Sequence, residues 1–252
     1  MGRRIFLAGA SGAIGQRLAR LLIEAGHRVT GTTRSRRKAD RLSALGVEPV
    51  VVDVFDAEAL RLAVSSAHPE IVIHQLTDLP DGLDPALMEK AVFANARIRE
   101  EGTRNLVEAA IAAGASRLIA QSIAWIYAPG PEPHHEGDPL DRNAEGSRAV
   151  SIGGVIALED RTLNSPPLEG VVLRYGQLYG PGTGFDAPKG ASPVHVDAAA
   201  HAALLAMDRC PPGIFNIAEP NPHVATDKAR EVLGWDPRFR LRSGTVGRMA
   251  AP

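Results

Sequence analysis

The chain has 252 residues, which is enough for one large α/β domain, or a cofactor domain with a small appendage, around a buried core. Its 28 Lys and Arg nearly balance its 29 Asp and Glu, so charge gives no reason to expect nucleic acid or an anionic membrane as partner, and a small molecule is the expected ligand. The single cysteine, Cys210, excludes an internal disulfide and a multi-cysteine metal site, and we predict no metal site.

The first 130 residues alternate short β-rich runs with helical patterns, which is typical of parallel βαβ units. In the first unit, a strand over 5–8 leads through a glycine turn into a helix that ends at Gly26. Further strands are expected over 28–33, 47–52, 71–75 and 116–121, and further helices over 38–45, 57–67 and 85–113. The short connections imply right-handed crossovers, so we predict a Rossmann-type α/β fold with a doubly wound parallel sheet.

Residues 129–147 are rich in Pro, Gly, His and acids and predict an exposed loop, a place where function often lies. After this loop the pattern predicts a helix over 155–163 and a strand over 170–174. An Ala-rich helix, a strand and a last helix are expected over 196–207, 214–217 and 226–233.

The glycine turn Gly9-Ala-Ser-Gly12-Ala-Ile-Gly15 lies where the first strand ends and its helix begins. Glycines there let the turn tighten, let the backbone approach a pyrophosphate and let the helix pack on its strand, while the helix N-terminus faces the phosphates. Such a turn alone can be plain turn chemistry, but the strand–turn–helix context favours a dinucleotide. The expected cofactor contacts from this turn are Gly9, Ser11, Gly12, Ala13, Ile14 and Gly15.

The residues after the second strand indicate which dinucleotide is bound. About 20 residues past the last glycine, an NAD-preferring fold usually places an acid for the ribose hydroxyls, but here Arg34 and Ser35 precede a basic run over 36–38. These groups suit a 2′-phosphate, so we predict that the cofactor is NADP(H), with NAD possible. The alternative is that these basic side chains are only the solvent-exposed start of a helix. Asp53, beside Val54, either contacts the adenine amino group or caps the next helix.

Several longer segments resemble the extended short-chain dehydrogenase/reductase superfamily, in its NAD-dependent epimerase/dehydratase branch. Besides the glycine turn and Asp53, these segments are 102–106, 173–183, 195–199, 215–220 and 228–235. The resemblance implies that Gln75, Leu76 and Thr77 line the dinucleotide, and that Tyr175 and Leu178 belong to the stretch that closes over the nicotinamide. By the same resemblance His74 lines the cofactor, whereas the alternative is a buried strand-end histidine with one hydrogen bond.

The domain organisation follows from these assignments. Residues 1–175 are expected to form the dinucleotide-binding Rossmann domain, with 196–218 returning to it, and 176–252 to form a small, truncated substrate-binding part that is not an independent domain. Family members pair their long helices, here 85–113 and 147–163, which predicts a homodimer. The chain shows no secretory signal and no apolar run near the roughly 20 residues that span a bilayer, so we expect a cytoplasmic protein.

The usual catalytic pair of the family is missing from the sequence. Hydride-transferring members use a Tyr and a Lys four residues later, and the Lys lowers the pKa of the phenol. If Glu159 is the acid usually found four positions after the Lys, the Tyr position is Ser151 and the Lys position is Val155. No shift of register restores the pair, because the residues four after the three tyrosines are Pro131, Tyr179 and Thr183.

Ser122 and Tyr127 are the candidate catalytic residues that remain. The end of the fifth strand resembles the family's Ser-rich segment leading to a Tyr, although the aligned Ser position is Ile123 and Ser122 is one residue away. Tyr127 is either a proton donor whose pKa a cation lowers or a structural residue. His134 and His135 belong to a polar loop rather than to a metal site, because adjacent histidines point apart.

The expected function is an NADP(H)-binding oxidoreductase or epimerase-like enzyme with a non-standard active site, acting on a small carbonyl or alcohol. Holding a substrate against the nicotinamide would then replace part of the work of the missing pair. Two alternatives stay open: a non-catalytic NADP(H)-binding sensor or scaffold, and a redox-neutral isomerase or dehydratase.

Overall fold

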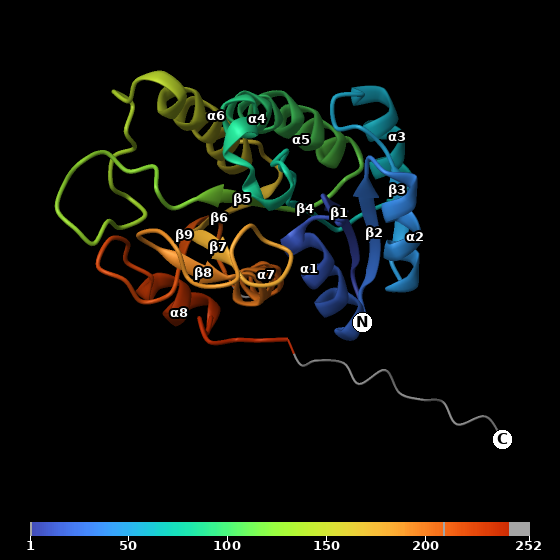
Figure 1. The fold of residues 1–252 in the computed structure, drawn as a ribbon. Helices are drawn as coiled ribbons and strands as arrows, with labels where there is room; N and C mark the ends of the chain where they lie inside the picture. Colours follow the sequence, from blue (N-terminus) through green and yellow to red (C-terminus); the bar gives the residue numbers. More distant parts are fainter. Residues whose placement is uncertain (1, 209, 242–252) are drawn as a thin grey trace.

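A computed structural model describes residues 2–208 and 210–241 of the chain, so residues 242–252 of the expected C-terminal part lie outside the described residues. Seven parallel strands form one twisted sheet in the order β3-β2-β1-β4-β5-β6-β9 (Figure 1). The strands are β1 (Arg4–Ala8), β2 (Arg28–Thr33), β3 (Glu48–Val51), β4 (Ile71–His74), β5 (Arg117–Ile123), β6 (Glu169–Tyr175) and β9 (Gly213–Ile217). The predicted Rossmann-type parallel sheet is confirmed.

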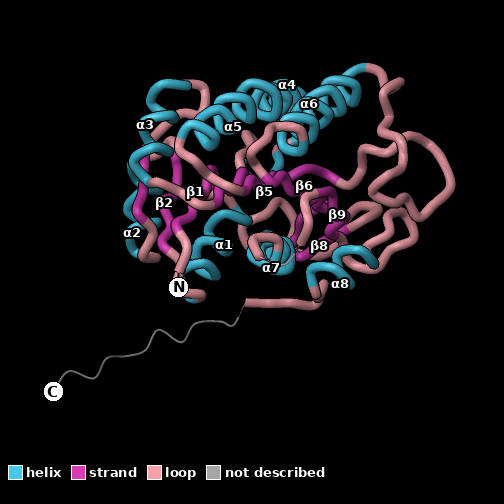
Figure 2. The backbone as a smooth tube through the Cα atoms, turned by 180° about the vertical axis from the view of Figure 1, so that it is seen from behind, coloured by secondary structure: helices cyan, strands magenta, loops and turns pink. Residues whose placement is uncertain are grey.

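Helices cover both faces of the sheet, as Figures 1 and 2 show from opposite sides. One face carries α3 (Ala57–Ala67), α4 (Pro85–Arg97), α5 (Thr103–Ala112) and α6 (Gly146–Leu163), and the other α1 (Ala13–Glu24), α2 (Arg36–Ala44), α7 (Val196–Leu205) and α8 (Asp227–Leu233). Because both faces are covered, the central strands are almost continuously apolar: β4, for example, reads Ile-Val-Ile-His and is fully buried. A separate core lies on each side of the sheet.

The part of the chain after β6 continues the same sandwich. β7 (Gln177–Tyr179) and β8 (Pro193–His195) form a small parallel pair beside the main sheet. The alanines of α7 have no exposed surface and allow close packing against α1, and β9 pairs with β6 at the sheet edge. None of the described helices is both long and apolar enough to cross a membrane.

The prediction of a single helix over 85–113 is wrong in one respect, because two helices are present. α4 and α5 are joined by a π-helical turn, Ile98–Gly102, which places an extra residue in the turn and rotates the residues on its two sides relative to each other. The helix expected over 155–163 is also longer, since α6 begins at Gly146, next to the polar loop.

Candidate active site

A cavity of about 1060 Å³ opens at the carboxyl ends of the central strands. It lies where the strand order reverses, between β1 and β4, which is the position at which open parallel sheets bind their ligands. Its volume is slightly above the roughly 300–1,000 Å³ typical of ligand sites, so it has room for an extended ligand. The residues that line it come from several separate segments of the chain between Ala8 and Phe185.

The glycine turn forms the wall of the cavity at the N-terminus of α1. Gly9 has a φ of +85°, and a Cβ there would lie 2.6 Å from the Gln75 carbonyl oxygen, so only glycine fits without strain. Gly12 precedes α1 without a side-chain cap, and the first turn of α1 contains no acid, which leaves its N–H groups for an anion. Of the turn residues predicted to bind the cofactor, Gly9, Ser11, Gly12, Ala13 and Ile14 line the cavity.

Gly15 is the predicted contact from this turn that does not line the cavity. A Cβ at Gly15 would lie 2.2 Å from the Gly9 carbonyl oxygen and 2.8 Å from the Ala10 carbonyl carbon. Its missing side chain therefore lets α1 pack against the turn, which is a structural role rather than a contact with the ligand.

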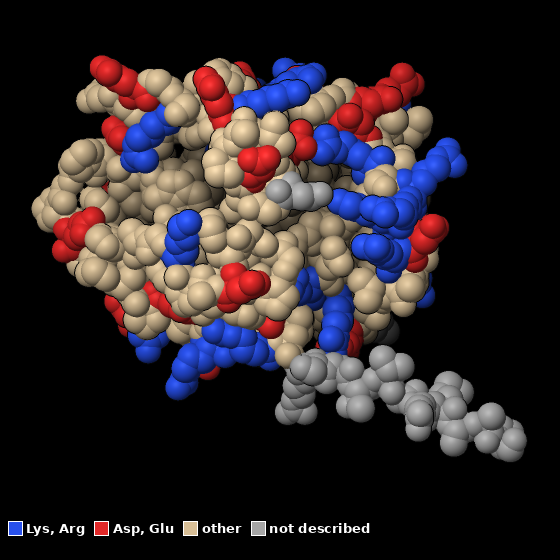
Figure 3. Space-filling view, in the orientation of Figure 1, with Lys and Arg blue, Asp and Glu red and all other residues tan. Residues whose placement is uncertain are grey.

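One end of the cavity is basic. Arg34 and Ser35 line it together with Lys38 and Arg41, and Figure 3 shows Lys and Arg side chains gathered on this side of the molecule, where α2 and α3 lie. The Arg34 Nη2 atom lies 2.6 Å from Asp78 Oδ1, and this hydrogen bond raises the pKa of Arg34. The bases also begin a helix, because the Ser35 side chain accepts a hydrogen bond from the Lys38 N–H at 3.4 Å and caps α2.

Asp53 and Val54 line the same end of the cavity. The Asp53 Oδ1 atom accepts a hydrogen bond from the Phe55 N–H at 3.0 Å. The residue that caps α3 is Asp56, which accepts from the Ala59 N–H at 3.0 Å. The alternative role of Asp53 as the cap of this helix is therefore wrong, whereas its place in the cavity suits a contact with a ligand.

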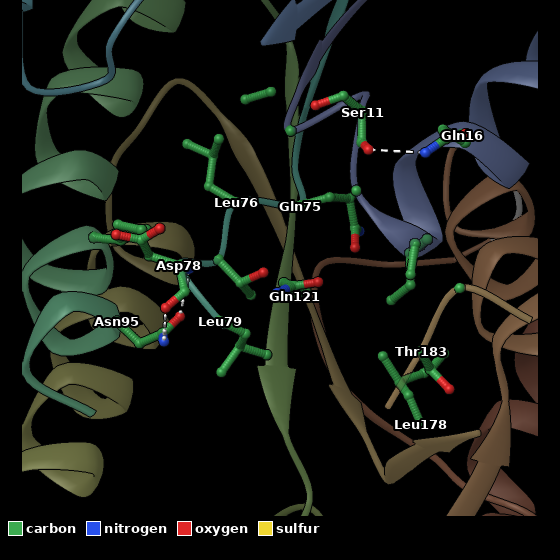
Figure 4. A pocket seen from close by; sticks show the side chains of 18 of the residues that line it. Ser11, Gln16, Gln75, Leu76, Asp78, Leu79, Asn95, Gln121, Leu178 and Thr183 are labelled. Atoms are coloured by element: carbon green, nitrogen blue, oxygen red, sulfur yellow. Dashed lines mark hydrogen bonds between the residues drawn. The ribbon is translucent and has the colours of Figure 1, made fainter. Parts of the chain in front are cut away.

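The middle of the cavity contains buried polar atoms without partners. Gln75, Leu76, Thr77, Tyr175 and Leu178 all line it, and Figure 4 shows several of them around the opening. Neither amide atom of Gln75 nor the hydroxyl of Tyr175 has a hydrogen-bond partner of normal geometry among the described residues, although all three are buried and the Gln75 side chain is near enough to the Tyr175 hydroxyl to act on its pKa. Because buried polar groups are rarely left unpaired, these atoms fit a ligand with donors and acceptors, such as a nicotinamide nucleotide. Burial raises the pKa of the Tyr175 phenol, which keeps it protonated.

Asn95 and Asp78 join this segment to α4. The Asp78 N–H donates to Asn95 Oδ1 at 3.0 Å, and Asn95 Nδ2 donates to the Asp78 carbonyl oxygen at 3.1 Å (Figure 4). Both residues line the cavity, as does Gln121 on β5, but the sequence did not single them out. A polar residue on a helix gives no signal of which loop it will clamp.

His74 does not line the cavity. It is fully buried, its Nδ1 accepts the Leu76 N–H at 3.2 Å, and its Nε2 lies 3.0 Å from Thr103 Oγ1. Burial lowers the pKa of His74 to about 4, with the Arg99 charge acting in the same direction. The reading of His74 as a buried strand-end histidine is therefore correct.

Ser122 lies at the inner end of the cavity. Its hydroxyl donates to Glu159 Oε1 at 2.7 Å, and Glu159 also accepts from Arg174, whose Nε and Nη2 lie 2.9 and 2.6 Å from its two oxygens. Ser151 lines the cavity beside this group, whereas Val155 has no exposed surface and packs with Ile126 and Ile152. The Tyr and Lys positions inferred from Glu159 thus hold one small polar residue and one buried apolar residue.

Tyr127 lies outside the cavity, which corrects its prediction as a catalytic residue. Its hydroxyl donates to Asn216 Oδ1 at 2.6 Å and accepts from Arg174 Nη1 at 3.0 Å, and its ring stacks on His134 with centroids 4.9 Å apart. Burial raises its pKa more than Arg174 lowers it. A phenol whose hydroxyl is already engaged both as hydrogen-bond donor and as acceptor, and whose pKa is raised, has a structural role. Among the described residues, no group of three or more His, Cys, Asp or Glu is arranged to hold a metal ion.

A family model described as NAD(P)H-binding matches residues 9–185, the segment that builds this cavity. The chain belongs to that NAD(P)H-binding family. The orphaned Gln75 and Tyr175 atoms and the uncapped α1 N-terminus fit such a dinucleotide.

Individual relatives agree with this assignment. The chain is 40% identical over 262 residues to a 3-diazoavenalumate denitrifying reductase of Streptomyces sp, with 96% of this chain and 82% of that protein covered. In structure it is similar to the UDP-glucose 4-epimerase of Thermotoga maritima, at a TM-score of 0.73, 20% identity and 94% of each chain. It is also similar to the Bordetella bronchiseptica enzyme WbmG in complex with NAD, at a TM-score of 0.70 and 20% identity, with 96% of this chain and 91% of that chain covered. Both solved structures share the fold of this chain, which agrees with the fold that the resemblance implied.

Proposed function

We propose that this protein is an NADPH-dependent reductase that transfers hydride to a small electrophile needing no proton from a Tyr–Lys pair. The observation that carries the proposal is the composition of the inner end of the cavity, where Ser122 and Ser151 stand and Val155 is buried. A carbonyl reduced there would need a proton for the developing alkoxide, and the loss of general acid catalysis typically costs about 10²–10⁴-fold in rate. An acceptor that carries its own leaving group avoids this loss.

A diazo arene is such an acceptor, and the 40% identical relative bears the name of a reductase of one. When NADPH is bound, its hydride would replace the N₂ group, so that a C–H bond forms, the C–N bond breaks, N₂ leaves and NADP⁺ remains, with no further proton consumed. The sequence predicted carbonyl and alcohol substrates instead, so the test of this proposal compares the reduction of a diazo arene with that of carbonyl compounds.

The residues of the chain would position the reactants rather than exchange protons. Arg34 and Ser35 would hold the 2′-phosphate, and the turn from Gly9 to Ile14 the pyrophosphate. The unpaired Gln75 amide and Tyr175 hydroxyl would bind the nicotinamide half and fix the face that it presents to Ser122. A buried single cysteine and this cofactor also support a cytoplasmic location.

Turnover of NADPH tests the proposal. We expect absorbance at the NADPH band to fall with 3-diazoavenalumate, and deuterium from 4-deuterated NADPH to appear on the arene carbon that lost N₂. Aldehydes, ketones and quinones should react at least about 100-fold more slowly, because no Tyr–Lys pair stands at the inner end to protonate the alkoxide. An enzyme-free reaction corrects for direct reduction of the diazo compound.

Gly12→Asp supplies the matched control. A Cβ at Gly12 would lie 3.4 Å from the Gly9 carbonyl oxygen, so a side chain fits, and Asp is a favourable N-cap, yet its charge would repel the pyrophosphate. This variant should fold and be inactive, while Gly12→Ser keeps activity. If no compound of the panel oxidises NADPH, a sensor or scaffold is favoured, and if product forms without consumption of NADPH, an isomerase or dehydratase is favoured. If carbonyl compounds are reduced as fast as the diazo compound, the protein is a carbonyl reductase. Each of these outcomes would overturn the proposal.

A further inference from the structure

Arg99 is a cation at the inner end of the cavity that forms no ion pair with any residue that the structure describes. It lines the cavity together with Ser122 and Ser151, and within residues 2–208 and 210–241 its guanidinium makes no hydrogen bond or salt bridge. The neighbouring Arg97, by contrast, binds Glu101 with Nε and Oε2 2.7 Å apart. An arginine beside a cavity whose N–H donors form no hydrogen bond within the protein can use these donors to bind a ligand.

The charges around Arg99 compensate its positive charge only in part. Glu159 offsets part of the burial that lowers the pKa of Arg99 to about 10, but both Glu159 oxygens already bind Arg174, and one of them also binds Ser122. Two guanidinium groups therefore share one carboxylate. The acids that line the cavity lie elsewhere, since Asp78 is bound to Arg34 and Asp53 lies beside that pair. Arg99 stays protonated at neutral pH, and a partly desolvated cation without a partner is unfavourable unless something binds it.

The backbone holds Arg99 in this position. It belongs to the π-helical turn Ile98–Gly102, and such turns are frequent at functional sites because they re-aim a side chain. The turn is fixed to the sheet through Thr103, whose hydroxyl lies 3.0 Å from the buried His74 Nε2 and 3.5 Å from the Ile98 carbonyl oxygen. Gly102 packs against Val54, because a Cβ there would lie 3.1 Å from its Cγ1. A cation on a turn held in this way is pre-organised for binding.

We infer that Arg99 forms a subsite for a carboxylate of the substrate, at the inner end of the cavity beside Ser122 and Ser151. A guanidinium can bind a carboxylate through two parallel N–H donors, which gives orientation as well as affinity. The inference deepens the proposed reductase function and rests on it for the identity of the ligand as a substrate: the acceptor would be a small aryl compound that carries an acid group and is held by it with its reactive end toward the nicotinamide.

Binding of an unreactive ligand tests the subsite without any turnover. Avenalumate and its methyl ester, in which a methyl group replaces the negative charge of the carboxylate, are titrated calorimetrically into the protein saturated with NADP⁺. We expect the acid to bind at least 10-fold more tightly than the ester, because hydrogen bonds to charged groups contribute about 1.5–3 kcal/mol, or roughly 10- to 150-fold. Arg99→Met should abolish that preference and leave the Kd of NADPH unchanged within about twofold. Arg97→Met, two residues earlier at the end of α4 and outside the cavity, should retain the preference.

Thermal unfolding separates a binding role from a structural one. Arg99→Met removes a desolvated, unpaired charge, so the Tm should stay the same or rise by roughly 2–4 °C. A fall of several degrees, a weakened NADPH complex, or an acid preference that survives in Arg99→Met or is absent from the wild type would each overturn the inference. Acid preference without turnover of the diazo compound would remove the proposed reductase activity and keep the subsite, whereas turnover without acid preference would do the reverse.

Discussion

At the scale of single residues, Arg34 is the side chain that we expect to set the preference between NADPH and NADH. Its guanidinium binds Asp78 at 2.6 Å, and both side chains are largely exposed. Exposed ion pairs contribute only about 0–1 kcal/mol, whereas a phosphate can take two charge-assisted hydrogen bonds from one arginine. A 2′-phosphate should therefore displace Asp78 from Arg34 when NADPH binds.

Two substitutions test this competition. Arg34→Met should weaken NADPH binding at least 10-fold and NADH binding less than threefold, as measured by calorimetry, because only NADPH carries the 2′-phosphate. Asp78→Asn should tighten NADPH binding a few-fold, since it removes both the competing partner and a negative charge near the phosphate. Arg37→Met, in the same basic run but outside the cavity, is the control. Equal losses for both cofactors would show that Arg34 does not read the phosphate.

Single residues also mark the limit of sequence reasoning. The place of the glycine turn at the cavity was predictable from its spacing after β1, and that of Gln75 from the resemblance to the epimerase/dehydratase branch. Tyr127 was not, because the groups that occupy its hydroxyl are Asn216 and Arg174, which are 89 and 47 residues away in the chain. Arg99 was missed because nothing in the sequence shows that an arginine in a helical pattern will lack a partner.

At the scale of elements, the π-helical turn explains both a wrong prediction and the position of the subsite. Apolar spacing predicts one helix over 85–113, and one additional residue in a turn does not disturb that spacing enough to be seen. The turn is stabilised by contacts from other elements: His74 at the end of β4 reaches Thr103 at the start of α5. Because the Leu76 N–H donates to Nδ1, the imidazole is neutral and donates from Nε2 to Thr103.

This buried neutral imidazole predicts a loss of stability in acid. The pKa of His74 is lowered from 6.5 to about 4, so between these values the unfolded chain binds a proton that the folded chain does not. The free energy of unfolding should fall as the pH drops from about 6.5 to 4, by up to roughly 3 kcal/mol from this group, and the contribution should be fully present above pH 6.5.

Urea unfolding at pH 7 and pH 4.5 measures the effect of His74. His74→Asn keeps an acceptor near the Leu76 N–H but does not titrate in this range, so it should lose less stability than the wild type between the two pH values. Burial also lowers the pKa of His27, His195 and His201, but these groups titrate equally in both proteins. Parallel losses in the two proteins would show that His74 does not contribute.

At the scale of the whole molecule, the strand order and the two helical layers follow from patterns that the sequence displays. Buried parallel strands appear as short apolar runs, and glycines such as Gly26, Gly46 and Gly114, each with a positive φ, end the helices before the next strand. The cavity is less predictable, because it depends on which stretches of α4 and α6 reach the carboxyl ends of the strands. Ser151 and Val155 show this: they are one turn apart on α6, yet one lines the cavity and the other is buried.

We predict a homodimer whose two chains meet at the outer surface of α4 and α6. These two helices lie side by side on one face of the molecule (Figure 2), and α4 exposes Leu87 and Phe93, which are 50% and 56% accessible. Pairing with the same helices of a second chain would bury these apolar side chains in a four-helix interface.

Light scattering at micromolar concentration should give about twice the chain mass of 26.7 kDa. Phe93→Glu should shift the protein toward the monomer, because a carboxylate would be buried at the contact without a partner. Leu62→Glu places the same charge on α3 at a residue of similar exposure, 53%, and should leave the dimer intact. A wild-type protein with the mass of a single chain would refute the dimer, and equal dissociation in both variants would place the interface away from α4.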